Sequence, residues 1–369
     1  VMSINSNRKY YPQLDAIRGV GIICIFFYHA YKPNFGNTFI EQLATFFYSN
    51  LYLSIDLFFV LSSFLITYLA LEEIAINGHF SIKNFFIRRI LRIWPLYFFI
   101  LCFAFLVVKN LANYYGQNIS MPPASWYYLF LGNFYTYPHV FFLQQLWTIS
   151  VEEQFYILWG ISLFFFYKKI KWVMLFFALT SISFNLYSAI TNKDNYFHSL
   201  TYLNEMMAGA YLAYAIRYNK KIIQYIKKLT IKYEIGIYLF IPLFFVTYFF
   251  LNRFFIGVGN NILYVIMRLI FITHSCVLVA HQFINVNSVF NLKKCTFFIY
   301  SGKISYGLYC YHGFVITFGT LAINKFKFTI HPFLTTILLL AITFFVATLS
   351  YTFLEKPFLK MKNKLGYSS

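Results

Sequence analysis

One segment near the start of the chain places a cation and an imidazole at opposite ends of an apolar run. Arg18 opens this run and His29 closes it. On a helix, these eleven steps separate the two side chains by about 16 Å along the axis. In a bilayer with a hydrocarbon core of about 30 Å, one group could hold an anionic ligand near one face while the other works deeper. The pair therefore predicts chemistry conducted through a membrane.

Other ionisable side chains also interrupt apolar segments. Asp56, Glu152, Glu153 and His312 each lie in such a segment, although an Asp, Lys or Arg at the centre of a membrane helix costs roughly 2.5 to 3.5 kcal/mol. In the topology argued below, the three carboxylates lie at the membrane depth of His29, in a chain with only 11 acidic residues. This coincidence predicts a functional site around His29, with hydrogen-bonded packing of a lone histidine as the alternative.

A cluster of basic residues follows the apolar segment that contains Asp56. Arg88, Arg89 and Arg92 fall within an arc of about 100° on a helix, and Ser81 is placed to cap its first turn. We expect this helix to lie at the membrane interface before Pro95 redirects the chain into an apolar span. The guanidinium groups would suit the phosphates of a ligand or the anionic head groups of lipids.

The elements that must position these groups follow from composition. Hydrophobic residues make up 60% of the 369 positions and charged residues 11%, with a mean hydropathy of +0.62, which is typical of a multi-span membrane protein. The net charge of +19 is not gathered into the basic stripe that nucleic acid requires, so nucleic-acid binding is excluded. We predict about ten transmembrane helices, at 14–31, 50–71, 93–112, 146–167, 171–190, 200–217, 235–252, 260–281, 304–324 and 333–354.

The distribution of basic residues orients these spans. With a cytoplasmic N-terminus, most Lys and Arg residues fall in inside segments, as the positive-inside rule requires. We therefore predict an all-α polytopic membrane protein with both termini cytoplasmic. A cleaved signal peptide is the competing interpretation of the first span, but no small-residue cleavage pattern follows His29. The five cysteines form neither a disulfide framework nor a zinc motif, and we expect no metal.

Seven short motifs follow one another along the chain: Leu14–Gly19, His29, Asp56–Thr67, Arg88–Tyr97, Trp147–Tyr156, Ile304–His312 and Tyr351–Pro357. In this order they resemble the acyltransferase-3 family of integral membrane acyltransferases. The resemblance covers nearly the whole chain, so we expect residues 1–369 to form a single acyltransferase-3-like transmembrane domain. Ser63 stands where the family often has Gly, a change that takes little space. Because the chain stops soon after Pro357, we expect no fused extracytoplasmic hydrolase-like domain.

This resemblance implies transfer of an acyl group, usually acetyl, from cytoplasmic acyl-CoA to a hydroxyl of an extracytoplasmic sugar. The acceptor would be a cell-surface glycan such as the O-antigen of lipopolysaccharide or another surface polysaccharide. The protein would lie in the lipid bilayer of a bacterial inner membrane. Acetyl-CoA, or another acyl-CoA, would be the donor, and the residues expected to meet its phosphates are Arg18, Arg88, Arg89, Arg92 and Lys303.

Within that reaction, His29 is expected to act as the general base, because a neutral histidine is suited to proton transfer. Glu152 or Asp56 would orient it and stabilise its protonated form, and Glu153 is an equally acidic neighbour. An acetyl-histidine intermediate is the alternative route. Further candidates for the tunnel or the substrate contacts are Ser150, Tyr306, His312 and Trp126, the last in an irregular stretch, 113–145, that also contains His139.

Two other functions are compatible with the same sequence. A transporter of a small solute or of the acyl donor would also combine many spans with buried charge, although no repeated halves are detectable. A non-catalytic membrane partner could keep the same fold, but the presence of His29, Arg89, Arg92 and Glu152 argues against it. The sequence leaves open the oligomeric state, the acyl chain and the acceptor hydroxyl.

Overall fold

The computed structural model describes residues 10–31, 33, 36–116, 119–135 and 140–364, and this part of the chain contains helices and no strand. Its α-helices are α1 (Pro12–Ala30), α2 (Phe39–Ser49), α3 (Ser54–Asn77), α4 (Ile82–Cys102), α5 (Lys109–Tyr114), α6 (Ala124–Tyr128), α7 (Phe141–Gln144), α8 (Trp147–Phe166), α9 (Ile170–Thr191), α10 (Leu203–Tyr218), α11 (Lys220–Lys227), α12 (Ile231–Phe254), α13 (Val258–Ile284), α14 (Thr296–Lys303), α15 (Ser305–Lys325), α16 (Pro332–Ser350) and α17 (Lys356–Lys364). Short helical segments join or extend them, at η1 (Leu51–Leu53), η2 (Phe103–Val108), η3 (Gly132–Phe134), η4 (Tyr167–Lys169), η5 (Ser199–Tyr202), η6 (Leu292–Lys294) and η7 (Tyr351–Glu355).

The predicted all-α fold is confirmed for these described residues, and each of the ten predicted spans falls on a helix or a run of helical segments. By length and composition, six segments are long and apolar enough to cross a membrane. The count of ten crossings and the cytoplasmic position of the termini therefore stay predictions. The six segments are Phe39–Asn77, Ile82–Tyr114, Phe141–Thr191, Ile231–Phe254, Val258–Ile284 and Pro332–Met361.

Pro95 does not separate the basic cluster from the third predicted span. Helix α4 runs from its predicted Ser81 cap to Cys102 with Pro95 inside it. A proline removes one backbone hydrogen bond and its ring crowds the preceding turn, but dense packing can hold such a helix together. Here Ile93 is only 5% exposed, and its carbonyl accepts a 2.8 Å hydrogen bond from the Tyr306 hydroxyl of α15. The basic cluster and the third predicted span are therefore parts of one helix.

Two glycines bring the backbones of α1 and α14 together. A Cβ atom on Gly302 of α14 would lie 1.7 Å from the carbonyl oxygen of Asp15, and one on Gly19 would lie 2.0 Å from the carbonyl oxygen of Phe298. No side chain can occupy either position, so the two helices pack backbone against backbone. This contact fixes the end of α1 that carries Arg18.

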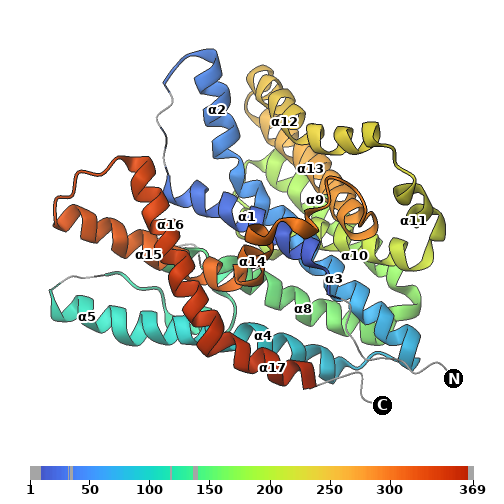
Figure 1. Cartoon of the computed structure of the whole chain (residues 1–369), viewed down its shortest axis with the longest axis horizontal. Coiled ribbons are helices and arrows are strands. Elements are labelled where there is room, and N and C mark those ends of the chain that lie inside the picture. Colours follow the sequence, from blue (N-terminus) through green and yellow to red (C-terminus); the bar gives the residue numbers. More distant parts are fainter. Residues whose placement is uncertain (1–9, 32, 34–35, 117–118, 136–139, 365–369) are drawn as a thin grey trace.

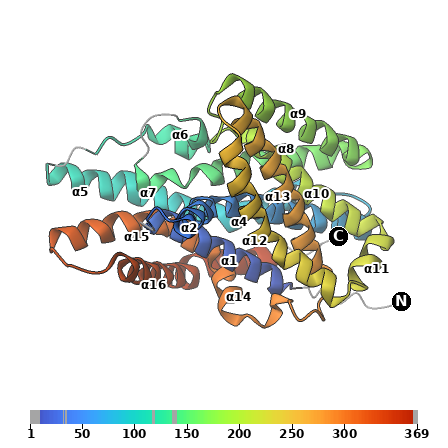
Figure 2. The same cartoon turned by 90° about the horizontal axis from the view of Figure 1, so that it is seen from above.

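Helix α1 lies near the centre of the bundle in both views of the molecule (Figures 1 and 2), where it contacts α3, α14, α15 and α16. Helix α3 packs along α10, and α13 packs against both of them. Helix α4 contacts α8 and α15. This arrangement brings the helices that carry the predicted arginines, carboxylates and histidines into one region of the molecule.

Candidate active site

The four predicted arginines gather around one cavity. It has a volume of about 200 Å³ and is lined by residues of α1, α3, α4, α8 and α15. Arg18 reaches it from α1, and Arg88, Arg89 and Arg92 reach it from α4. We name this cavity the arginine chamber. Most of its other walls are apolar or aromatic, and they include Ile25, Ile55, Phe58, Phe59, Leu65, Ile66, Leu69, Phe85, Ile149, Tyr156, Tyr306 and Tyr309.

Two of these arginines are already paired. The guanidinium of Arg18 lies 3.0 Å from the carboxylate of Asp15, one turn earlier on α1. That of Arg88 lies 2.7 Å from Glu73 near the end of α3. Both pairs are largely buried, with the side chains at most 15% exposed. A carboxylate therefore offsets the positive charge of each of these two arginines, which weakens its attraction for an anionic ligand.

Arg89 and Arg92, in contrast, form no ion pair with any residue that the structure describes. The Arg89 guanidinium lies 5.7 Å from the ring centroids of Phe85 and Tyr156. Its Nε atom is buried and has no hydrogen-bond partner within the described ranges. Since an unpaired buried donor carries a desolvation cost of about 1 to 3 kcal/mol, Arg89 is the cation here that gains most from an incoming anion.

Glu152 lines the arginine chamber rather than the surroundings of His29. One of its oxygens accepts a 2.9 Å hydrogen bond from the Tyr156 hydroxyl, which lies 3.0 Å from the Ser62 hydroxyl of α3. The neighbouring Glu153 accepts a 3.3 Å hydrogen bond from the indole N–H of Trp94. Glu152 can therefore adjust the charge of the arginine chamber, whereas Glu153 lies against α4.

A smaller cavity, of about 120 Å³, adjoins His29. We name it the histidine chamber. Aromatic rings provide faces for stacking and side-chain amides provide hydrogen bonds, a combination that suits a sugar. Its lining consists of Tyr28, His29, Ile55, Phe141, Gln144, Gln145, Trp147, Tyr196, Phe197, Tyr309 and His312.

Two histidines from different helices meet in this chamber. Nε2 of His312 lies 3.2 Å from Nδ1 of His29, and the two rings stack with an angle of 21° between their planes. Nδ1 of His312 lies 2.6 Å from the carbonyl oxygen of Tyr309. Because a carbonyl only accepts hydrogen bonds, this Nδ1 carries the proton of a neutral His312. Nε2 of His312 then accepts from Nδ1–H of His29, which leaves Nε2 of His29 as a proton acceptor.

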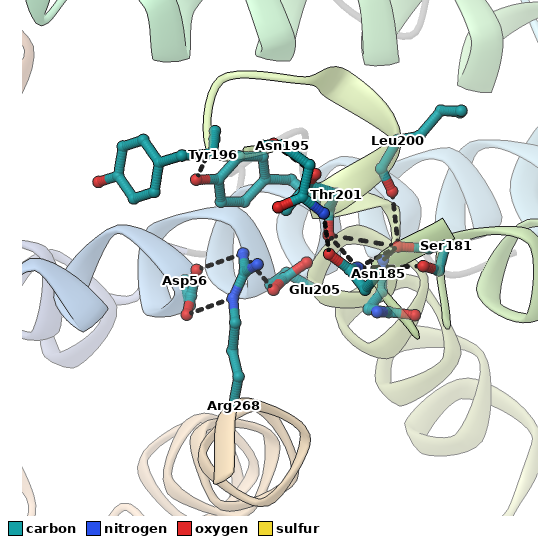
Figure 3. Close-up of polar contacts among 11 residues, drawn as sticks. Asp56, Ser181, Asn185, Asn195, Tyr196, Leu200, Thr201, Glu205 and Arg268 are labelled. Carbon is teal, nitrogen blue, oxygen red and sulfur yellow. Dashed lines mark hydrogen bonds and ion pairs between the residues drawn. The ribbon is translucent and has the colours of Figure 1, made fainter. Parts of the chain in front are cut away.

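Asp56 belongs to a separate ionic cluster. Its two oxygens accept hydrogen bonds of 3.1 and 2.9 Å from the guanidinium of Arg268 on α13. The same guanidinium lies 2.7 Å from Glu205 on α10, and Figure 3 shows Arg268 between the two carboxylates. All three side chains are at most 6% exposed. Among the contacts of the described residues, His29 has a hydrogen bond to His312 and none to Asp56 or Glu152.

The segment between α9 and α10 forms one wall of the histidine chamber, through Tyr196 and Phe197. A network of polar contacts fixes this segment, as Figure 3 shows. The Asn185 amide donates to the Thr201 carbonyl at 3.0 Å, and the Asn195 amide donates to Asn185 at 2.9 Å. The wall facing His29 is therefore anchored to α9.

The two chambers adjoin one another. Ile55 and Tyr309 line both of them. On α1 the lining passes from Arg18 to His29 as the residue numbers rise, and α15 follows the same direction. On α8 it runs the opposite way, from Tyr156 in the arginine chamber to Trp147 in the histidine chamber. The lining residues therefore follow one order along these helices, from the guanidinium groups to the imidazoles.

The other predicted residues divide between these walls and positions away from them. Tyr306 lines the arginine chamber and His312 the histidine chamber. Lys303 is exposed, 5.8 Å above the Tyr351 ring. Ser150 and Trp126 line neither chamber; Ser150 is fully buried, and Trp126 packs beside the hydrophobic core. His139 lies outside the described residues.

Sequence reasoning missed Ile55, Tyr309 and Tyr196. Tyr309 precedes His312 by one helical turn within the same motif, so helical spacing alone could have placed it beside the imidazole. Ile55 precedes the first residue of the Asp56 motif, and nothing distinguishes it from the other apolar residues of α3. Tyr196 comes from a loop, and its position depends on contacts that a linear pattern does not contain.

The sequence model of the acyltransferase domain family matches residues 11–352. Peptidoglycan O-acetyltransferase OatA of Listeria monocytogenes is 26% identical over 375 residues, which cover 96% of this chain and 56% of that protein. A putative O-acetyltransferase of Staphylococcus aureus strain COL is 28% identical over 376 residues, covering 95% and 58%. This chain therefore spans a little more than half the length of these two curated relatives. No solved structure matches it.

Proposed function

The chain belongs to the acyltransferase-3 family of acyltransferase domains, and from that premise we propose that it is a membrane O-acyltransferase. The acyl group, in the first instance acetyl, comes from an acyl-CoA held in the arginine chamber. The acceptor is a hydroxyl of a cell-surface glycan that enters the histidine chamber. The observation that carries this proposal is the adjoining of the two chambers, one lined by four arginines and the other by two hydrogen-bonded histidines.

The arginine chamber suits the phosphates of coenzyme A. A guanidinium group binds phosphate oxygens through two parallel N–H donors, and the buried Nε of Arg89 has no other partner in the described part of the chain. Arg92 adds a second guanidinium without an ion pair there. Acyl-CoA would supply the thioester, and the apolar walls of the chamber would surround the arm that carries it.

The histidine pair supplies the proton transfer. Nε2 of His29 accepts the proton of the acceptor hydroxyl, whose oxygen bonds to the acyl carbon. The bond between that carbon and the thioester sulfur breaks, and His29 returns the proton to the sulfur. His312 holds the required tautomer, because its Nε2 accepts the Nδ1–H of His29 while its own Nδ1–H is bound by the Tyr309 carbonyl. In this mechanism His312 has the orienting role that the sequence suggested for a carboxylate.

The same lone pair of His29 permits a two-step route, with the acyl group held briefly on Nε2. Incubation with radiolabelled acetyl-CoA and no acceptor separates the two routes. Label retained on His29 after denaturation would assign the two-step route, and kinetics that require both substrates together would assign direct transfer.

The acceptor is proposed from the chamber and from the relatives. Tyr28, Trp147 and Tyr196 offer ring faces beside the amides of Gln144 and Gln145, which supports a sugar as the acceptor. The peptidoglycan named for the Listeria relative makes peptidoglycan the first acceptor to test, and lipopolysaccharide the second. We place the arginine chamber toward the cytoplasm of a bacterium, in its inner membrane, because the positive-inside rule puts most basic residues there.

Replacement of His29 tests the proposal. Mass spectrometry of surface glycans from cells expressing His29→Ala should show at least a 100-fold loss of O-acetyl esters, since general-base catalysis contributes about 10² to 10⁴. His79→Ala, in the exposed turn after α3, is the matched histidine control. Normal esters in a well-inserted His29→Ala variant would contradict the mechanism, and movement of a solute without ester formation would establish a transporter instead.

A further inference from the structure

Two residues, one aliphatic and one aromatic, lie between the arginine chamber and the histidine chamber and line both of them. Ile55 of α3 and Tyr309 of α15 line both cavities. We propose that these two side chains form a constriction that sets the length of the acyl group transferred, so that acetyl passes and longer chains are rejected. The inference rests on the acyltransferase function proposed above and adds to it the residues that choose the donor.

Ile55 is held in place by the charged residue next to it. Asp56 binds the guanidinium of Arg268 through both oxygens, and Arg268 also reaches Glu205. The cluster ties α3 to α13 and α10, and Ile55 itself is only 7% exposed. An ion cluster this deeply buried resists rearrangement, because separating its members would leave unpaired charges in an apolar interior. The wall formed by Ile55 therefore cannot move away easily from a larger acyl group.

Tyr309 is held by hydrogen bonds at both of its ends. Its hydroxyl donates to the carbonyl of Gln145 at 2.6 Å and lies 2.7 Å from the Thr148 hydroxyl. Its own carbonyl binds Nδ1 of His312 at 2.6 Å. The ring cannot swing aside without breaking both hydroxyl contacts, and the backbone from which it projects is held separately by His312. The second wall is thus as fixed as the first.

The space beyond the constriction is limited. The acyl group is the leading end of the donor, so it passes Ile55 and Tyr309 before the thioester carbon reaches His29. The histidine chamber has about 120 Å³, well below the roughly 300 to 1,000 Å³ of ordinary ligand pockets, and it must also admit the acceptor hydroxyl. Each added methylene competes for this volume, and one methylene commonly changes selectivity by about 10-fold or more. No bond changes beyond the transfer already described are involved.

The constriction can be tested by competition between donors. Purified full-length protein in nanodiscs receives equimolar acetyl-, propionyl- and butyryl-CoA, with isolated peptidoglycan sacculi as acceptor, and the acyl groups on the glycan are counted by mass spectrometry. Ile55→Ala should raise the ratio of butyryl to acetyl transfer at least 10-fold. Ile55→Val, which removes one methyl group and preserves the packing, should raise it by a smaller factor. Tyr309→Phe keeps the ring and loses both hydroxyl contacts, so its ratio should also rise.

Ile284→Ala is the matched control, because Ile284 at the end of α13 is about as buried as Ile55 and lines neither chamber. Its ratio of acyl products should equal that of the wild type. Unchanged ratios in Ile55→Val and in a folded Ile55→Ala variant would overturn the constriction. Failure of the proposed function has a different signature, because the wild type would then release no free coenzyme A thiol with any of the three donors and acylate neither sacculi nor lipopolysaccharide.

Discussion

Two buried arginine sites in this protein hold their charge in opposite ways. At the first, Arg268 lies between Asp56 and Glu205, with one cation shared by two carboxylates. At the second, four arginines line a cavity in which Arg89 and Arg92 have no ion pair with a described residue. The cation of the first site is already paired. Because burial of an unpaired charge is costly, the second site gains from an anionic ligand.

The two arginine sites also differ in what they contact: one links helices, and the other lines a cavity. Arg268 and Glu205 line neither the arginine chamber nor the histidine chamber, and the cluster links α3, α10 and α13. The arginines of α1 and α4 line the larger chamber directly. A buried ionic residue in a membrane segment suggests function by default. Whether a cation there is already paired with a carboxylate indicates whether it holds the fold together or can bind a ligand. Stability and donor binding should therefore respond separately to mutation at the two sites.

The largest effect is expected at the cluster of Arg268, Asp56 and Glu205, which we call the closed site because its cation is already paired. Arg268→Met leaves the carboxylates of Asp56 and Glu205 buried without their cation, and breaking a buried pair in this way typically costs about 3 to 5 kcal/mol. We expect the free energy of unfolding in detergent to fall by that amount. Denaturant titration of the purified protein, followed by tryptophan fluorescence, measures it.

A triple variant sharpens this result. Arg268→Met combined with Asp56→Leu and Glu205→Met removes every charge of the cluster, so most of the lost stability should return, since replacing a buried ion pair by apolar residues of similar volume is often close to neutral. If the triple variant is as unstable as the single one, the cluster acts through packing and not through charge balance.

A smaller effect, on kinetics more than on stability, is expected at the arginine chamber, which we call the open site. Arg89→Ala removes a guanidinium that breaks no described ion pair when it is lost, so the free energy of unfolding should change by less than at Arg268, where two carboxylates lose their cation. A hydrogen bond to a charged group contributes about 1.5 to 3 kcal/mol. The value of kcat/KM for acetyl-CoA should therefore fall roughly 10-fold to 100-fold. Steady-state release of coenzyme A thiol gives both kinetic constants.

The controls for Arg89 distinguish charge from shape. Arg253→Ala removes an exposed arginine from α12, outside both chambers, and should leave the kinetics unchanged. Arg89→Lys keeps the charge without the forked donor geometry, so it should lie between the wild type and Arg89→Ala. A wild-type kcat/KM in Arg89→Ala would mean that this helix meets lipid head groups rather than the donor.

The contrast between these sites explains what could be predicted from the sequence. Helical spacing placed Arg18 and His29 at opposite ends of one helix, and the structure shows both on α1, in the walls of different chambers. The clustering of Arg88, Arg89 and Arg92 on one face follows from the same local geometry, and the three line one cavity. Features set within a single helix are readable in this way, because the period of the helix fixes them.

Features set between helices were not readable. Asp56 and Arg268 lie 212 positions apart in the chain, so no local pattern connects them. A shared membrane depth is all that suggests Asp56 or Glu152 as the partner of His29. His312, which contacts His29, lies 283 positions away on α15, so no local pattern connects these two residues either. Pro95 is a different case, because it lies inside α4 and does not end the helix. Membrane depth restricts which side chains can meet, but helix packing decides which ones do.

The smallest effect is expected at Arg18, which stands between the two extremes. Its guanidinium lines the arginine chamber, yet it is paired with Asp15 at 3.0 Å. Asp15→Asn should release Arg18 to the donor and lower KM for acetyl-CoA about 1.5-fold to 2-fold, in keeping with the roughly 0.2 to 0.5 kcal/mol of an ion pair one turn apart on a helix. The same change removes an anion from the first turn of α1, which should cost about 0.3 to 1 kcal/mol of stability. Asp15→Glu retains the charge and serves as the control. An increase of KM in Asp15→Asn would show that the carboxylate orients Arg18 toward the donor, and Arg18 would then belong with the closed site in its dependence on a partner.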